Sequence, residues 1–495
     1  MFKRYLTTVF LLSLAILLSA QGLSTIEEDV HRFILENGAT LLVLPRTNVP
    51  IINCATVANV GGSREEPGIT GISHYLEHMA FKGTEQIGTT DIESELPILA
   101  ECHRIFDEIL IEQEKGKDAD QELLASLEQE LEDAIARADQ YVVDNEFNKI
   151  LDLNGSRRLN AATSMDMTMY TVSLPSNKLE LWMLLEADRF SNPVFRQFYQ
   201  ERDVILEEKR MYDGSPTYRF ANYFMKEVFD VNPYRNPLIG EEDDIRSITE
   251  AQLRAYFDKY YGARNLVFSI VGDVEPERAL ELANKYLAKI PAGERAEPVV
   301  FEEPEQQEER LFSYEDRSQP YIMIGYKIPP ASHPDFPIYS VIADILGQGR
   351  TSRIYQALVE EKQLAAHVYS YNGAPGKVYE NLFLINVIPM QDASLEECLE
   401  EIDRQLAILQ NEPVTSEELA GVKRRVLMRS INRLESGLGL AVQLAYNEAL
   451  FGDFGELFSE LEKVDNVTEE DIIRIMNEVL VPENRTIGIL TTESR

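Results

Sequence analysis

Two histidines and a glutamate stand at a spacing that suits metal chemistry. In the segment His74-Tyr75-Leu76-Glu77-His78 the two imidazoles are four positions apart, and residues i and i+4 share one face of a helix. Both rings can therefore ligate one metal ion, while Glu77 beside them can accept a proton from a water molecule. The chain has only six histidines, so a chance pairing on an ordinary amphipathic helix is the weaker explanation.

A catalytic zinc site needs three protein ligands and one open position, and zinc lowers the pKa of a bound water to about 7. The order H-x-x-E-H is a signature of zinc hydrolases. The pattern therefore predicts one zinc ion per chain, held by His74 and His78 with Glu77 as general base. A third ligand has to come from elsewhere in the sequence.

The elements around this motif follow from turn signals and periodicity. Asn37-Gly38 between alternating apolar residues predicts a hairpin over 32–43, and 51–60 reads as a further strand. The period then changes to that of a helix over 70–82, with Thr70 as the expected N-cap and Gly83 as its end. Mixed strand and helix patterns over 21–290 predict an α+β domain that carries the motif.

Two stretches differ from the rest in composition. Residues 92–150 are acidic, with apolar residues at helical spacing on both sides of Lys115-Gly116-Lys117, which predicts a helical hairpin inserted in the first domain. Residues 291–312 are rich in Glu and Pro with little periodicity, and we interpret them as a linker. A second domain over 313–495 follows, with a strand at 319–326, a helix at 334–346 and a last strand at 486–490. Its order of elements resembles that of the first, which suggests a duplicated fold.

Charge and cysteine content exclude several classes of protein. The chain has 47 basic and 84 acidic residues, a formal net charge of -37, which argues against a nucleic-acid partner. Three cysteines, at 54, 102 and 398, are too few and too far apart for a disulfide framework or a cysteine metal site. If acidic residues also line the site, basic peptides should be attracted to it.

The N-terminus predicts export. Lys3 and Arg4 precede an apolar run over 6–18, and the small residues Ser19 and Ala20 follow, the arrangement of a signal peptide over 1–20. The run is shorter than the ~20 residues that span a bilayer, so an uncleaved anchor is the weaker alternative. We expect no membrane span after cleavage, and a location in the periplasm or outside the cell.

The residues around the metal motif resemble those of the M16 peptidases, the pitrilysin or insulinase family that includes the mitochondrial processing peptidases. The similarity is carried by Gly71 to Thr84, by Leu159-Asn160-Ala161-Ala162-Thr163-Ser164, and by Glu201 to Glu208. It continues through Pro233-Tyr234, Ile239-Gly240, Leu346 to Gly349 and Ser352-Arg353. The resemblance covers essentially the whole chain after the signal and points to a bacterial member.

This resemblance implies a fold and a set of roles. The fold would be α+β, with two related LuxS/MPP-like domains of mixed sheet and packed helices that form a clamshell around a chamber. Glu208 would be the third zinc ligand, and Glu201, two helical turns before it, a supporting carboxylate. Asn160 and Ala161 would lie on an edge strand to which a substrate peptide adds as a further strand. The implied activity is that of an exported zinc endopeptidase acting on peptides or unfolded segments.

The sequence departs from the family pattern in the second half. Members usually carry there an Arg and, seven residues later, a Tyr that help to stabilise the transition state, whereas the matching positions hold Val359 and Ala366. Neither side chain can donate a hydrogen bond. We therefore expect this chain to be the metal-bearing subunit of a heterodimer whose M16 partner supplies the pair, with a homodimer as the other arrangement. The remaining alternative is a non-catalytic scaffold or binding subunit with the same fold.

Overall fold

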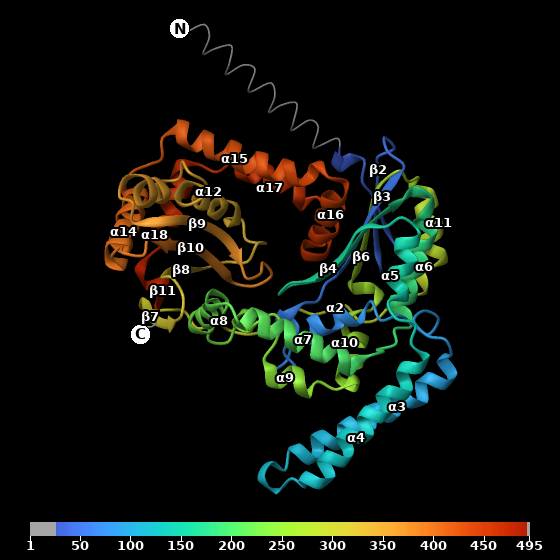
Figure 1. Cartoon of the computed structure of the whole chain (residues 1–495). Helices are drawn as coiled ribbons and strands as arrows, with labels where there is room; N and C mark the ends of the chain where they lie inside the picture. Colours follow the sequence, from blue (N-terminus) through green and yellow to red (C-terminus); the bar gives the residue numbers. More distant parts are fainter. Residues whose placement is uncertain (1–25, 493–495) are drawn as a thin grey trace.

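The structure, a computed structural model, describes residues 26–492, and the predicted signal peptide at 1–20 lies outside them. Two mixed β-sheets, each with packed helices, face one another like the halves of a clamshell (Figure 1). This arrangement confirms the α+β fold of two related domains. No helix in the described part of the chain is long and apolar enough to cross a membrane.

The first sheet has six strands in the order β1-β2-β6-β3-β5-β4. Strand β2 runs parallel to β6, and the other neighbours are antiparallel. The predicted hairpin at Asn37-Gly38 joins β1 to β2. The strands are β1 (His31–Ile34), β2 (Thr40–Pro45), β3 (Ile51–Ala58), β4 (Arg157–Thr163), β5 (Thr168–Pro175) and β6 (Leu266–Gly272).

The second sheet repeats this connectivity with five strands, in the order β7-β11-β8-β10-β9. Strand β7 runs parallel to β11, as β2 does to β6, and the remaining pairs are antiparallel. The matched order and directions identify the duplication that the predicted order of elements only suggested. The strands are β7 (Arg310–Asp316), β8 (Tyr321–Ile328), β9 (Ala365–Ala374), β10 (Asn381–Pro389) and β11 (Arg485–Thr492).

Helices pack on both sheets. In the first half they are α2 (Ile72–Met79), α3 (Ile92–Gln113), α4 (Gln121–Ala138), α5 (Glu146–Leu153), α6 (Leu179–Ser191), α7 (Phe198–Asp213), α8 (Pro216–Val228), α9 (Glu242–Ser247), α10 (Glu250–Tyr260) and α11 (Pro276–Lys285). In the second half they are α12 (Phe336–Leu346), α13 (Arg353–Tyr355), α14 (Leu395–Asn411), α15 (Ser416–Glu435), α16 (Gly437–Phe451), α17 (Glu456–Asp465) and α18 (Glu469–Glu478). Helices α15 and α16 meet at Ser436.

Each half lends a helix to the sheet of the other half. Helix α16 packs its apolar residues, among them Leu440 and Leu444, on the face of β3 and β6 that the first half's own helices leave uncovered. Helix α8 packs Phe220 and Phe224 on the second sheet. A Cβ on Gly488 would lie 2.8 Å from the Phe224 ring, so glycine there lets the ring rest on the strand backbone. The two halves therefore complete one another's cores.

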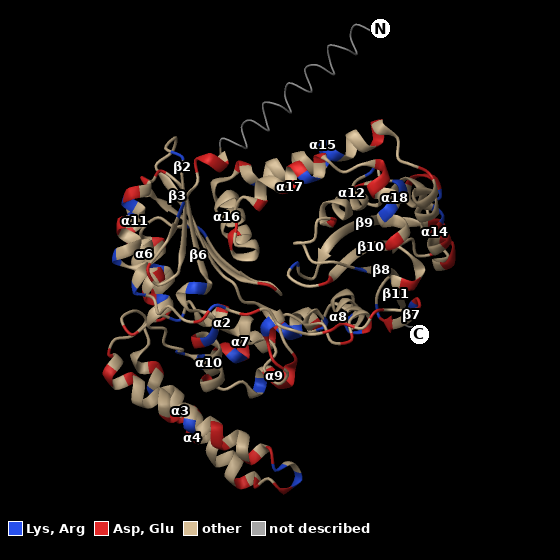
Figure 2. Cartoon of the chain, turned by 180° about the vertical axis from the view of Figure 1, so that it is seen from behind, with Lys and Arg blue, Asp and Glu red and all other residues tan. Residues whose placement is uncertain are grey.

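Helices α3 and α4 form an antiparallel arm that projects from the body (Figure 1). This confirms the predicted helical hairpin, and Figure 2 shows Asp and Glu spread along it. A buried ion pair at 2.8 Å joins Glu95 of the arm to Arg196, which lies just before α7. The rings of Phe106 in the arm and Tyr199 in α7 lie 5.1 Å apart.

The segment 291–309 has no helix or strand, as expected of a linker. Glu303, in the middle of this segment, nevertheless contacts both halves of the chain. Its carboxylate accepts hydrogen bonds from the backbone N–H groups of residues 230–232 and pairs with Lys327 of β8 at 2.6 Å. The segment is thus attached to both halves, while the domain boundaries drawn at 291 and 312 stay predictions.

Candidate metal centre

Helix α2, which carries the motif, begins after Gly71 and ends at Met79 with Ala80 as its C-cap, so the expected end at Gly83 was wrong. Gly71 precedes its first residue with φ +88°, a left-handed conformation that glycine adopts without strain. Glu65 caps this end, because its carboxylate accepts hydrogen bonds from the backbone N–H of Gly71 at 2.7 Å and Ser73 at 2.9 Å. The expectation that Thr70 is the N-cap was wrong. The hydroxyl of Thr70 donates instead to Asp244, a contact that local sequence does not reveal.

Three side chains converge as potential ligands of one metal ion. His74 Nε2 lies 3.7 Å and His78 Nε2 3.6 Å from Glu208 Oε2, and one ligand atom from each residue lies within 4.8 Å of the others. A tetrahedral zinc with ligands at about 2.0–2.1 Å separates them by roughly 3.3–3.4 Å. The observed spacings are too long for hydrogen bonds and suit a shared cation. The donor set, two imidazoles and a carboxylate, therefore fits zinc.

Glu201 lies behind the cluster and orients one of its ligands. His78 Nδ1–H donates to Glu201 Oε1 at 2.7 Å, which directs Nε2 toward Glu208. Lys82 Nζ forms a close ion pair with the other oxygen of Glu201. Such carboxylate–histidine contacts fix the ring and its tautomer in zinc sites. Glu207, the neighbour of Glu208, is exposed and pairs with Arg210, as expected of a residue that faces away.

Glu77 is held beside the cluster by a residue from the edge strand. Thr163 Oγ1, at the end of β4, donates to Glu77 Oε2 at 2.6 Å. This hydrogen bond fixes one carboxylate oxygen of Glu77. The arrangement suits a group that accepts a proton from a water molecule near the ligands.

Burial and neighbouring charges separate the pKa values at this site. Burial lowers the pKa of His74 to about 4, so its ring is neutral at neutral pH, the form that ligates metals. Burial also lowers the pKa of His78, but the hydrogen bond and charge of Glu201 outweigh it and the net shift is upward. The pKa of Glu201 is lowered overall because His78 and Lys82 oppose the effect of its burial. Burial raises the pKa of Glu77.

A cleft opens beside the cluster. Asn160 and Ala161 of β4 line it, as the resemblance implied, together with residues that follow the arm, Val142 to Asn145 and Asn148. Glu77, His78, Phe81, Lys82, Leu159, Gln197 and Glu201 complete the lining. The end of the 92–150 insertion therefore forms one wall of the cleft.

Two family models match separate regions of the chain. The model described as "Insulinase (Peptidase family M16)" matches residues 42–100 and 134–242, which include His74, His78 and Glu208. The model described as "Peptidase M16 inactive domain" matches residues 247–426. Together they cover more than half of the chain. The chain belongs to peptidase family M16. In this M16 protein the three potential ligands lie in the first matched region, and the described residues of the second contribute none of them.

Similar proteins cover nearly the whole chain. The "Zinc protease PqqE" of Helicobacter pylori is 25% identical over 96% of this chain and 94% of that protein. The "Uncharacterized zinc protease YmxG" of Bacillus subtilis is 24% identical over 88% and 93%. The crystal structure of a protease from Helicobacter pylori superposes with a TM-score of 0.76 at 24% identity, covering 93% of this chain and 99% of that one. The periplasmic protease PqqL of Escherichia coli superposes with a TM-score of 0.70 at 19% identity, over 94% of this chain and 48% of that one.

The sequence did not predict a role for two residues of the site, Thr163 and Lys82. Both lie within the motifs that resemble the M16 family, and this position in the sequence is the signal that points to them. Their specific contacts, to Glu77 and Glu201, join residues 86 and 119 positions apart, which only the fold reveals.

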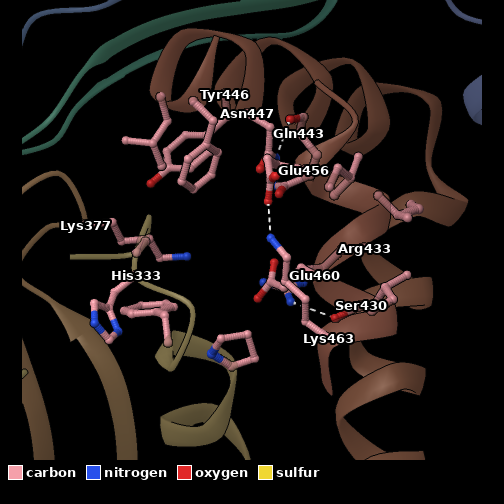
Figure 3. A pocket seen from close by; sticks show the side chains of 18 residues that line it. His333, Lys377, Ser430, Arg433, Gln443, Tyr446, Asn447, Glu456, Glu460 and Lys463 are labelled. Atoms are coloured by element: carbon pink, nitrogen blue, oxygen red, sulfur yellow. Dashed lines mark hydrogen bonds and ion pairs between the residues drawn. The ribbon is translucent and has the colours of Figure 1, made fainter. Parts of the chain in front are cut away.

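The two positions that depart from the family pattern lie in the second half, outside the cluster. Val359 packs partly buried against the second core, and Ala366 is exposed at the start of β9. A separate cavity lies between the segments around His333 and Lys377 on one side and α15, α16 and α17 on the other (Figure 3). No residue of the metal cluster lines it.

Proposed function

We propose that this chain is an exported zinc-dependent endopeptidase that hydrolyses peptides or unfolded segments between its two halves. The observation that carries the proposal is the convergence of His74, His78 and Glu208 at spacings that fit one cation, with Glu77 fixed beside them. The zinc proteases similar to this chain support the same reading. We assign one zinc ion to each chain.

The roles of the side chains follow from their positions. His74, His78 and Glu208 hold the metal, which when bound polarises a peptide carbonyl and makes water more acidic. Glu77 takes the proton of the attacking water on its carboxylate and delivers it to the departing amine. Glu201 fixes the ring of His78 and so positions a ligand. Asn160 and Ala161 offer the strand to which the substrate backbone pairs.

The proposal extends to location and assembly. The signal-like N-terminus supports export, and a similar protein, PqqL, is described as periplasmic. Val359 and Ala366 stand where family members carry hydrogen-bond donors, which supports a role as the metal-bearing subunit of a two-subunit enzyme. A homodimer is the other assembly, and a non-catalytic scaffold is the alternative function. The intact ligand set and base disfavour the scaffold.

The decisive experiment compares wild type with Glu77→Gln. The variant removes the base but no ligand, so we expect it to retain one equivalent of zinc and to lose about 10³-fold in peptide hydrolysis. Unchanged turnover would refute the role of Glu77, and a wild-type chain without zinc or activity in any assembly would favour the scaffold. The assembly is tested separately, by assaying the chain alone and with its candidate M16 partner. Full activity alone contradicts the two-subunit arrangement.

A further inference from the structure

Strand β4 is the outermost strand of the first sheet and its free edge borders the metal cleft. Its C-terminal residue, Thr163, holds Glu77, and Leu159 to Ala161 line the cleft. A substrate strand that pairs with β4 therefore continues past these residues to the N-terminal end of the strand. Two arginines, Arg157 and Arg158, stand at that end.

Both arginines are exposed and neither has an acidic partner. Within the described residues no ion pair involves either guanidinium, and Arg157 donates one hydrogen bond, to the carbonyl of Ser156 at 2.9 Å. Arg425 and Arg429, in contrast, share the carboxylate of Asp344.

The backbone at this pair is distorted in a way that alters the strand. Arg158 has φ +54°, a left-handed conformation that arginine rarely adopts. The register of β4 against β5 shifts here, with Arg157 opposite Ser173 but Asn160 opposite Thr171, so β4 has one extra residue. A bulge of this kind lets two consecutive side chains escape the usual alternation. Accordingly both Arg157 and Arg158 are exposed.

We propose that Arg157 and Arg158 form a subsite for a carboxylate of the substrate, on the C-terminal side of the cleaved bond. This rests on the proposed peptidase function. A peptide that pairs antiparallel to β4, as β5 does on the other edge, runs from Thr163 toward Arg157. Guanidinium groups bind carboxylates through paired hydrogen bonds. The carboxylate belongs either to an Asp or Glu side chain or to the C-terminus of a short peptide.

The distance along the strand sets the position of that carboxylate. Thr163 and Arg158 are separated by roughly 13–17 Å at about 3.3 Å per residue, the lower value allowing for the extra residue of the bulge, so the subsite meets the third to fifth residues after the cleaved bond. The contact differs from the long-range attraction of basic peptides that the net charge suggests, because it acts at this one place. Substrates with a basic N-terminal part and an acidic C-terminal part are favoured both by the net charge and by the arginine subsite.

Binding to zinc-loaded Glu77→Gln protein tests the subsite without requiring turnover. The bond that the wild type cleaves is mapped first, and fluorescent peptides then carry Asp or Asn at the third to fifth positions after that bond. If the wild type cleaves no bond, Asp or Asn is placed at each position along the peptide in turn. Each peptide has a free or an amidated C-terminus, which distinguishes the two sources of the carboxylate. We expect Asp, or the free C-terminus, to tighten binding roughly tenfold, and less at high salt.

Paired substitutions assign the effect to the arginines. Arg157→Gln with Arg158→Asn removes both charges, and Asn tolerates the left-handed backbone. We expect the tenfold preference to vanish while zinc content and affinity for the Asn peptide stay unchanged. The control, Arg104→Gln with Lys117→Gln in the arm, removes the same charge far from β4 and should keep the preference.

The proposal is overturned if amidated peptides with Asp and with Asn bind equally and if free and amidated C-termini also bind equally. A preference that survives the arginine substitutions, or one confined to the N-terminal side of the bond, also overturns it.

Absence of cleavage by wild type, in contrast, counts against the peptidase function and leaves the binding comparison able to decide on the subsite.

Discussion

The two sheets share a strand order, yet their first helices differ in every property that matters for chemistry. Helix α2 follows β3 and α12 follows β8, each before the outermost strand of its sheet. Helix α2 directs Glu77 and His78 toward the cleft and His74 toward Glu208. Helix α12 buries every residue except Ser340, and its single charged residue, Asp344, pairs with Arg425 and Arg429.

This difference shows how a duplicated scaffold divides its tasks. The connectivity supplies a helix beside an edge strand twice, but only α2 is paired with a helix, α7, that brings carboxylates to it. In the second half the equivalent surface of α12 is filled by α15 and α17. Chemistry therefore depends on what faces the helix rather than on the strand order.

Loss of a ligand from α2 should have the largest effect. We expect His74→Ala to lose zinc and about 10³-fold in peptide hydrolysis, measured by metal analysis and cleavage rate. Ser340→Ala on α12 is the matched control and should keep both. Full zinc content in His74→Ala would show that the histidine is no ligand.

Removing volume from α12 should damage stability instead of chemistry. Ile342 is fully buried, so Ile342→Ala should lower the free energy of unfolding by about 2–5 kcal/mol, measured by urea denaturation. Zinc content at low denaturant should stay at the wild-type value. If the variant lost zinc while folded, the second half would be coupled to the metal centre and the division of tasks would fail.

Glu201 tests whether the support of a ligand is distinct from ligation. Glu201→Gln keeps an acceptor for His78 but loses its charge, so zinc affinity or activity should fall about 10–100-fold. Titration with a competing chelator measures the affinity. Glu207→Gln, exposed on the same helix, should change neither, and equal losses in both variants would point to a general effect of charge on α7.

The charge on α12 should have the smallest effect. Asp344→Asn leaves Arg425 and Arg429 without a carboxylate, but both are close to half exposed and water can replace it. We expect a loss of about 1–2 kcal/mol in unfolding free energy, measured by thermal unfolding. Asp392→Asn, on an exposed turn, is the control. A loss of activity in Asp344→Asn at full stability would assign α12 a chemical role.

The parts of the site that sequence could predict are those encoded locally. Four-residue spacing was enough to pair His74 with His78, whereas Glu208 lies 130 positions further on and needed the family's pattern. Thr70 was misassigned because the side chain it binds, Asp244, comes from a distant helix. Contacts of this kind depend on the complete fold.

Composition predicted which segments are exposed better than it predicted the contacts that join those segments to the rest of the chain. The acidic hairpin was identified from its periodicity. The composition of residues 291–312 predicted a linker. The neighbouring sequence does not indicate that Glu303 accepts hydrogen bonds from the backbone of 230–232 and pairs with Lys327. The amphipathic patterns of α8 and α16 are equally visible in the sequence, yet which sheet each one covers is decided by the closed arrangement of the two halves.

The exchange of helices has a consequence for how the chain is made. The first sheet is complete when β6 ends at Gly272, but the helix that covers its second face begins at Gly437. At 5–20 residues per second, synthesis needs roughly 10–30 s to bridge that gap. For that interval one apolar face of the finished sheet has no cover of its own. The nascent chain must be either kept unfolded or shielded until the residues from Gly437 onward arrive.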